Sequence, residues 1–303
     1  MLQSYQIKLI KFFNVKKVND LIWFDHKIIG RSEAVAGADS IGLKYGAGCF
    51  ITLRYYAGRY LHFDSHLQRL QDGMSYLDIH PGRFPEAETI KQAFHQISQK
   101  AGVRNKEMKA RFQVFISDGG GYSFKPDQNI SMIATIGEMK PAVEEYIMHP
   151  VDITVIPNAV RPSDLKLCNN LHFMKALRQA EKTGANNALM STVDGRVSGA
   201  ATGNVFWKKD QRIYTPDLSC DILNGVTRRI FCKLVQVKGD YELAEGSFQL
   251  TDLLQADAVW MTNSVSEIQP VFQVDNVKFD MNDPVFAYLK HAFSAYKKEY
   301  LRS

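Results

Sequence analysis

The sequence predicts an α+β protein folded into two domains. Its 303 residues are enough for two domains of about 150 residues each, with a cleft between them. Hydrophobic residues make up 45% of the chain and charged residues 23%, which is typical of a globular protein rather than a disordered or fibrous one. Strand and helix signals alternate along the chain, and the strand signals are often paired across a turn, which indicates the α+β class.

Four segments are expected along the chain. Residues 137–142 are rich in turn formers and have no apolar period, so they indicate a connection between domains. The predicted organisation is an N-terminal extension, a small domain, a linker and a larger domain, over residues 1–20, 21–137, 138–145 and 146–303. The apolar stretch at residues 7–15 is interrupted by lysines and is too short to span a bilayer, so we expect it to pack on the fold or on a partner subunit.

The small domain is predicted to contain a hairpin, two helices and two further strands. Residues 51–56 and 59–63 flank Ala57-Gly58, where glycine can adopt a positive φ, and this pattern predicts a hairpin. Apolar residues then recur at helical spacing over 66–76 and again around 91–100. The remaining elements are strands at 112–116 and 131–136, separated by the glycine-rich residues 118–122.

The larger domain is predicted to mix strands and helices. A strand is expected at 151–156 and a helix at 171–182, followed by a hairpin that turns at Asp194-Gly195. Asp283 followed by Pro284 predicts the start of a C-terminal helix. Its apolar stripe would consist of Val285, Leu289, Ala292 and Tyr296.

Charge and composition exclude several classes of site. The net charge of +5 is not concentrated in one segment, which weakly favours small anionic ligands; the short basic cluster at 106–111 is interpreted as a solvated helix face or strand edge, so no nucleic-acid partner is expected. The four cysteines are far apart and form no CxxC pair, so neither zinc nor disulfides are expected and reduced thiols indicate a cytoplasmic protein. The histidines form no ligand pattern, and no nucleophile elbow or Walker loop occurs, so we expect no metal.

Two segments could bind an anion. Residues 223–228 precede an apolar-periodic run, and the free N–H groups of a helix start bind phosphate. The alternative is ordinary capping by Asn224 or Thr227. Residues 263–267 follow an apolar strand and offer small hydroxyl and amide groups, or they simply form a turn. Taken alone, each pattern favours the structural explanation.

Lys166 lies between two leucines, in the segment DLKLC. A buried lysine loses its charge readily, as a lysine that forms a Schiff base requires. In most proteins such a lysine reaches solvent instead, and spacing alone does not single it out.

The ordered set of these segments resembles the class IV (fold type IV) pyridoxal-phosphate enzymes, which include branched-chain and D-amino-acid aminotransferases and aminodeoxychorismate lyases. The resemblance runs from about residue 20 to the C-terminus. The segments that carry it are YGAGCFITLR at 45–54, HLQRL at 66–70, LKLCN at 165–169, GNVF at 203–206, TP at 215–216, ILNGVTR at 222–228 and TNSVSEIQPV at 262–271.

The resemblance implies roles for particular residues. The lysine matching Lys166 would bind the aldehyde of pyridoxal 5′-phosphate and later move a proton, and Arg69 would clamp the phosphate with its permanently charged fork. The other phosphate-side positions match Val226, Thr227, Asn263 and Ser264. The resemblance further implies a fold type IV architecture with the cofactor cleft between two domains, and a homodimer with active sites near the subunit interface.

The sequence also departs from the family pattern. Gly199 stands where the family usually has a glutamate that keeps the pyridine nitrogen of the cofactor protonated. Ile51 stands where the family often has a glutamate on the substrate side, and residues 112–124 contain no Arg-x-His carboxylate trap, so D-amino acids are less expected. The segment 116–123 resembles the glycine-rich loop of aminodeoxychorismate lyases without its arginines.

Three functions follow from these features. The first is a transaminase that transfers an amino group between an amino acid and a 2-oxo acid. The second is an aminodeoxychorismate lyase-like β-elimination that yields 4-aminobenzoate and pyruvate. The third is a non-catalytic relative that binds the cofactor without turnover, because of Gly199.

Overall fold

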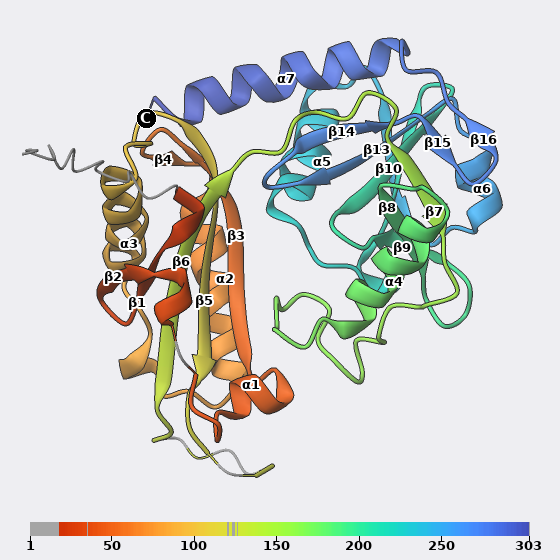
Figure 1. Cartoon of the computed structure of the whole chain (residues 1–303). Coiled ribbons are helices and arrows are strands. Elements are labelled where there is room, and N and C mark those ends of the chain that lie inside the picture. Colours follow the sequence, from red (N-terminus) through yellow and green to blue (C-terminus); the bar gives the residue numbers. More distant parts are fainter. Residues whose placement is uncertain (1–17, 35, 120, 123–124, 126, 303) are drawn as a thin grey trace, which may run out of the picture.

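The protein consists of two lobes, and its long C-terminal helix extends across both of them (Figure 1). The computed structural model describes residues 18–34, 36–119, 121–122, 125 and 127–302, so most of the predicted N-terminal extension lies outside the described residues. Figure 1 shows an elongated lobe built from the first half of the chain and a larger lobe built from the second half. Helix α7 (Pro284–Tyr300) crosses from the larger lobe to the small lobe, where it ends near the β3–β4 hairpin.

The small lobe is a six-stranded antiparallel sheet covered on one face by two helices. Its strand order is β2-β1-β6-β5-β3-β4. The strands are β1 (Leu21–Phe24), β2 (Lys27–Gly30), β3 (Gly48–Tyr56), β4 (Arg59–Tyr60), β5 (Glu107–Ile116) and β6 (Ile130–Glu138). The helices are the short α1 (Ile41–Tyr45), together with α2 (Phe63–Tyr76) and α3 (Ala87–Lys100), which pack on the sheet.

The alternation of side chains along β3 and β5 divides this sheet into two faces. Ile51 and Leu53 of β3 pack with Phe112 of β5 in the core under α2 and α3. Residues of opposite parity, such as Phe50 and Arg54, point away from this core and contact the larger lobe. The period of two therefore places one polar face of the sheet at the junction of the lobes.

The larger lobe contains two five-stranded sheets. Their orders are β12-β11-β10-β13-β14 and β16-β15-β7-β8-β9. The strands are β7 (Ile147–Pro150), β8 (Asn187–Ser191), β9 (Val197–Ala200), β10 (Asn204–Lys209), β11 (Arg212–Pro216), β12 (Glu242–Gly246), β13 (Ala258–Asn263), β14 (Glu267–Val271), β15 (Gln273–Val274) and β16 (Val277–Lys278). The helices besides α7 are α4 (Leu171–Lys182), α5 (Val226–Lys238) and α6 (Leu250–Leu254).

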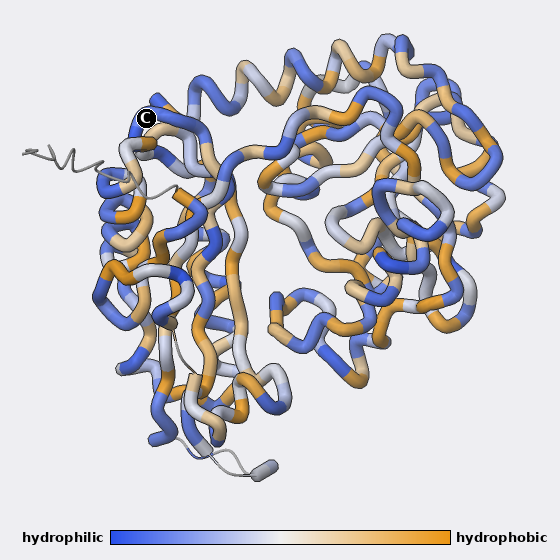
Figure 2. The backbone as a smooth tube through the Cα atoms, viewed as in Figure 1, coloured by the Kyte–Doolittle hydropathy of each residue, from blue (hydrophilic) through white to orange (hydrophobic). Residues whose placement is uncertain are grey.

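The first of these sheets has an apolar layer on each face. Val205 and Trp207 of β10 pack toward the second sheet, whereas Phe206 packs with α5 and α7. Helix α4 covers the second sheet through Ala176 and Ala180. Figure 2 shows hydrophobic and hydrophilic residues alternating along α7, as expected for a helix with one buried face.

Most predicted elements are confirmed. The first hairpin turns at Ala57-Gly58, the second lies between β8 and β9, and Asp283 caps α7 by accepting a hydrogen bond from the Val285 amide at 2.9 Å. Helix α4 has the bounds expected from the sequence. Within the described residues, no helix is long and apolar enough to cross a membrane. The predicted domain limits stay a prediction.

Two expectations were wrong. Residues 151–156 form no strand: β7 ends at Pro150, because its pairing with β8 covers only Met148 to Pro150, and the amides of Val151 and Val155 make isolated bonds to β8 beyond it. The basic cluster at 106–111 does not lie at a sheet edge or on a helix. Residues 107–111 belong to β5, which pairs with β3 on one side and β6 on the other, so their charges line the central part of the sheet.

Candidate functional site

Lys166 lies where the larger lobe docks onto the small one. Strand β4 pairs only with the last two residues of β3, which leaves the edge of β3 open toward Gly48. The Lys166 segment occupies this open edge: the Phe50 amide donates to the Lys166 carbonyl oxygen at 2.9 Å, and the Cys168 amide donates to the Gly48 carbonyl oxygen at 2.8 Å. Backbone pairing therefore holds the lysine at the junction of the lobes.

The Lys166 amino group is surrounded by cations and by an aromatic ring. Its Nζ lies 5.1 Å from the centre of the Phe50 ring, and it forms no ion pair with any described residue. Burial lowers the pKa of Lys166 to about 7, and the charges of Arg69 and Arg111 contribute to this lowering. A large fraction of the amine is therefore neutral near pH 7 and able to act as a nucleophile.

Two arginines that the sequence analysis did not single out support this lysine. Arg161 is 8% exposed and donates to the side-chain oxygens of Asn169 (2.9 Å) and Asn170 (3.2 Å), so it braces the chain just after Lys166. The Arg111 guanidinium stacks 3.6 Å from the centre of the Phe50 ring, the same ring that Lys166 contacts. Only the tertiary structure links these arginines to the lysine, because no local motif contains both.

The start of α5 offers free backbone donors. Its N-cap residue is Gly225, and no described side chain caps the helix, so the alternative of capping by Asn224 or Thr227 is wrong. The side chain of Thr227 points elsewhere, with its Oγ1 3.5 Å from Ser264 Oγ. An uncapped helix start presents N–H groups and the positive end of the helix dipole, which together bind anions.

Arg69 of α2 lies against this helix start. Its Nη2 donates to the Asn224 carbonyl oxygen at 2.8 Å, and the residue is 8% exposed. Among the described residues it forms no ion pair with a carboxylate. Burial, reinforced by the charge of Arg229, lowers the pKa of Arg69 to about 10, so it stays protonated near pH 7. A buried cation without an anionic partner is expensive, and an anionic ligand would supply that partner.

The two predicted site residues in the turn after β13 point in different directions. Asn263 Oδ1 accepts the amides of Val265 (2.9 Å) and Ser266 (2.7 Å), so this side chain shapes the turn itself. Ser264 faces α5, where its hydroxyl lies near that of Thr227. The structure therefore places Val226, Thr227 and Ser264 around one small cavity at the start of α5, with Arg69 bonded to Asn224 beside it. This is the candidate anion site, and Asn263 shapes the turn that carries Ser264.

Gly199 lies buried in β9, where it pairs with Met190 of β8. A Cβ added at this position would meet the Gly203 carbonyl oxygen at 3.1 Å, which is tight contact. Because of this tight contact, a side chain at position 199 would require a small shift of the Gly203 backbone. Neither Met190 nor Gly203 carries a charge, and glycine itself offers no carboxylate.

The chain is similar in sequence and in fold to proteins of one known family. The family model for amino-transferase class IV matches residues 48–274. The chain is 30% identical over 265 residues to an aminodeoxychorismate lyase of Bacillus subtilis (strain 168), covering 86% of this chain and 88% of that protein. The structure resembles an Escherichia coli branched-chain amino acid aminotransferase at a TM-score of 0.82 and 23% identity, covering 91% and 94% of the two chains.

A second similar structure is a branched-chain amino acid aminotransferase solved with pyridoxamine 5′-phosphate, at a TM-score of 0.80 and 22% identity, covering 91% of this chain and 94% of that one. The predicted α+β, fold type IV architecture is thereby confirmed. The match of the family model over most of the chain extends the agreement from the fold to the sequence. The chain belongs to the class IV aminotransferase family.

Proposed function

We propose that this protein is a pyridoxal-phosphate-dependent transaminase, which transfers an amino group between an amino acid and a 2-oxo acid, with Lys166 as its catalytic residue. The proposal rests on the burial of Lys166 beside the Phe50 ring, which lowers its pKa to about 7, close to Arg69, a buried arginine that forms no ion pair with a described residue. A neutral lysine beside an anion site is what a phosphorylated aldehyde requires.

The residues present fit the phosphate and the aldehyde of this cofactor. The uncapped start of α5 would donate the amides of Val226 and Thr227, and the hydroxyls of Thr227 and Ser264 would add side-chain donors. Arg69 would supply the positive charge, as a guanidinium that a backbone carbonyl already orients. The resemblance assigns position 199 to the ring nitrogen, and Gly199 would offer no carboxylate there.

The bound cofactor would supply an aldehyde and a conjugated ring that accepts electrons from the substrate's Cα–H bond. Lys166 would bind the aldehyde and would then carry the proton removed from the substrate Cα, because its amine is neutral near pH 7. His66, whose pKa burial lowers to about 3, would contribute no positive charge. Arg111 forms no ion pair with a described residue and would attract a substrate carboxylate.

The test of this proposal is a half-reaction. Purified protein loaded with pyridoxal phosphate is mixed with a panel of L-amino acids, with D-amino acids as a comparison. We expect at least one L-amino acid to convert the absorbance of the bound cofactor to that of pyridoxamine phosphate, with one equivalent of 2-oxo acid formed. A loaded protein whose spectrum no amino acid changes would contradict the proposal.

A second candidate is the lyase reaction, which the 30% identity to an aminodeoxychorismate lyase favours. The glycine-rich residues 118–122 motivated the same alternative, but Gly120 lies outside the described residues. Release of pyruvate from aminodeoxychorismate under turnover conditions would support the lyase. If the loaded protein performed neither reaction, the third alternative of a non-catalytic relative would hold.

The pKa of Lys166 leads to a pH prediction. The Lys166 amine is protonated below about pH 7 and neutral above it, and only the neutral amine attacks an aldehyde. The rate at which the protein captures pyridoxal phosphate covalently should therefore rise through about pH 7 and then level off. Replacing Arg111 by Gln removes a nearby cation, so the midpoint should move to higher pH. Borohydride trapping at a series of pH values measures this midpoint.

The matched control for this experiment is Arg212→Gln, which removes an exposed arginine paired with Glu242. Its midpoint should equal that of the unmodified protein. A midpoint that does not move in the Arg111 variant would show that the arginine does not act on Lys166.

The cellular context belongs to the same proposal. We propose a cytoplasmic homodimer that uses amino acids and 2-oxo acids as small-molecule substrates and has no nucleic-acid, membrane or metal partner. All four cysteines are free thiols in the structure, which is consistent with a reducing compartment.

A further inference from the structure

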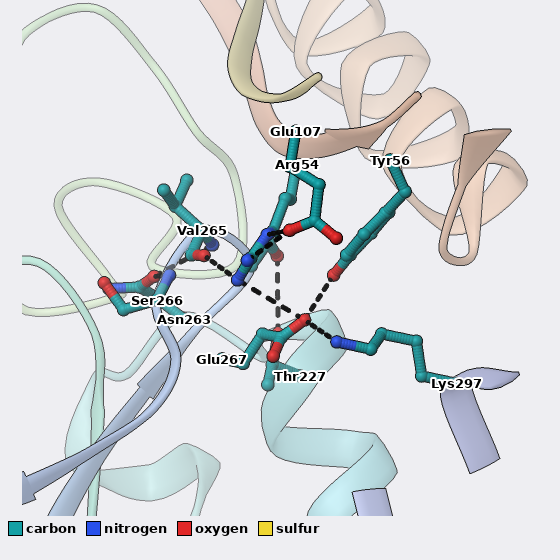
Figure 3. Close-up of polar contacts among 10 residues, drawn as sticks. Arg54, Tyr56, Glu107, Thr227, Asn263, Val265, Ser266, Glu267 and Lys297 are labelled. Carbon is teal, nitrogen blue, oxygen red and sulfur yellow. Dashed lines mark hydrogen bonds and ion pairs between the residues drawn. The ribbon is translucent and has the colours of Figure 1, made fainter. Parts of the chain in front are cut away.

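A polar network joins the two lobes beside the anion site. The Glu267 carboxylate accepts hydrogen bonds from the Tyr56 hydroxyl and from the Lys297 amino group, each at 2.7 Å, as Figure 3 shows. Tyr56 belongs to β3 of the small lobe, Glu267 begins β14 of the larger lobe, and Lys297 lies in α7. The Glu267 carboxylate therefore links β14 to β3 and to α7, which are all far apart in the sequence.

Arg54 connects this carboxylate to the turn after β13. Its Nη1 donates to the Val265 carbonyl oxygen at 3.2 Å and lies 3.5 Å from Glu267 Oε1. Its Nε donates to Glu107 at 2.9 Å, so two carboxylates hold the guanidinium in one orientation (Figure 3). The turn is thus held by Arg54 at its carbonyl and by Asn263 at its amides.

The backbone of Glu267 indicates that this arrangement is under constraint. Its φ is +62°, a region that glutamate rarely adopts and that persists only where the surroundings hold it. The side chains of Arg54, Glu267 and Lys297 are 20%, 17% and 21% exposed. Ion pairs this well shielded are screened less by salt than pairs on the open surface.

The network and the anion site share the walls of one small cavity. The network contributes Arg54, Tyr56 and Glu267, the anion site contributes Val226, Thr227 and Ser264, and His66 lies in the same wall. A shift of the turn by a fraction of an ångström would therefore change the spacing between Ser264 and the start of α5, which is now 3.5 Å between the two hydroxyls.

We propose that Arg54 and Glu267 are positioning residues for the anion site. They hold residues 263–266 so that Ser264 faces the start of α5 at the spacing that a phosphate group requires. Lys297 extends this support to α7, so docking of the C-terminal helix stabilises the same turn. The inference rests on the proposed function, because the phosphate is taken to be that of the cofactor.

The experiment compares two probes that differ only in the phosphate. Affinities for pyridoxal 5′-phosphate and for pyridoxal are measured by equilibrium titration in the unmodified protein and in Arg54→Gln, Glu267→Gln and Lys297→Met. We expect the first two variants to bind pyridoxal phosphate about tenfold more weakly, the cost of losing one shielded charged contact, and to bind pyridoxal unchanged. The Lys297 variant should show a smaller loss with the same selectivity.

Glu242→Gln is the matched control, since it breaks the exposed pair with Arg212 and should change neither affinity. If a variant bound pyridoxal phosphate and pyridoxal more weakly by the same factor, the cause would be a general loss of structure, and the inference would be overturned. Unchanged affinity of the variants for pyridoxal phosphate would overturn it as well. Should Glu267→Gln fail to fold, the other two variants decide the question. If the unmodified protein bound neither pyridoxal phosphate nor inorganic phosphate in a thermal-shift assay, the proposed function would fail as well.

Discussion

Replacing Lys166 by Ala is expected to abolish covalent attachment of pyridoxal phosphate and to reduce transamination by at least about a thousandfold. Alanine retains the backbone bonds that join this segment to β3, so the fold should persist. It removes the amine placed beside Phe50, and with it both the attachment point and the proton carrier. Borohydride reduction followed by peptide mapping should find a pyridoxyl group on Lys166 in the unmodified protein and none in the variant.

Lys175→Ala is the control for this experiment, because Lys175 is an exposed lysine on the nearby helix α4. The control should retain the label at Lys166 and its full activity. A pyridoxyl group at another lysine, or undiminished turnover in the Lys166 variant, would remove Lys166 from its proposed role.

Replacing Gly199 by Glu is expected to destabilise the cofactor-free protein by roughly 3–5 kcal/mol, the cost of a buried carboxylate without a partner. The first atom of the new side chain would approach the Gly203 carbonyl oxygen at 3.1 Å, so part of the loss would be steric. Gly199→Gln separates the two causes, since it has nearly the same shape and no charge. The free energy of unfolding, measured by denaturant titration, should be lower for Glu than for Gln at pH 7.

The pH dependence of this difference has a definite sign. Burial raises the pKa of a carboxyl group, so the folded Glu variant binds more protons than the unfolded chain and gains stability as the pH falls. The difference between Glu and Gln should therefore shrink in acid. A difference that stayed constant with pH would exclude a buried carboxylate at this position.

Loading with pyridoxal phosphate provides the functional part of the Gly199 experiment. If the ring nitrogen lies beside position 199, its protonated form would pair with the new carboxylate, so the cofactor should stabilise the Glu variant more than the Gln variant. The half-reaction should also be faster in the Glu variant, because a protonated ring accepts electrons more readily. Equal stabilisation of both variants would show that the ring nitrogen lies elsewhere.

Local patterns in the sequence were sufficient to predict those elements whose structure depends on residues that are close along the chain. The hairpin at Ala57-Gly58 depends on a glycine that can take a positive φ, and the start of α7 depends on one side chain two residues from the amide it caps. Helix α4 follows from the spacing of its apolar residues. In contrast, residues 151–156 are mostly apolar and β-branched like a strand, but only the amides of Val151 and Val155 bond to β8, so the regular pairing ends with β7 at Pro150.

The candidate site, too, could be predicted only in part from the sequence. The ordered motifs were enough to select Lys166, Arg69, Val226, Thr227 and Ser264 as candidates, because each lies in one of the segments that carry the resemblance to the class IV family. The same motifs also included Asn263, whose side chain turned out to bond its own turn. A motif identifies a position, whereas the direction of a side chain depends on the bonds it forms in the folded protein.

The class of the fold, its main helices and hairpins, and Lys166 as the candidate lysine could all be predicted from the amino-acid sequence. In contrast, the folded chain was needed to show that α5 begins without a side-chain cap, that Arg161 and Arg111 lie near Lys166, and that Glu267 bonds Tyr56 from 211 residues away. These features could not be predicted because burial, pKa and contacts between distant residues depend on how the lobes pack together. Propensity, capping and hydrophobic period depend only on residues that are close in the chain.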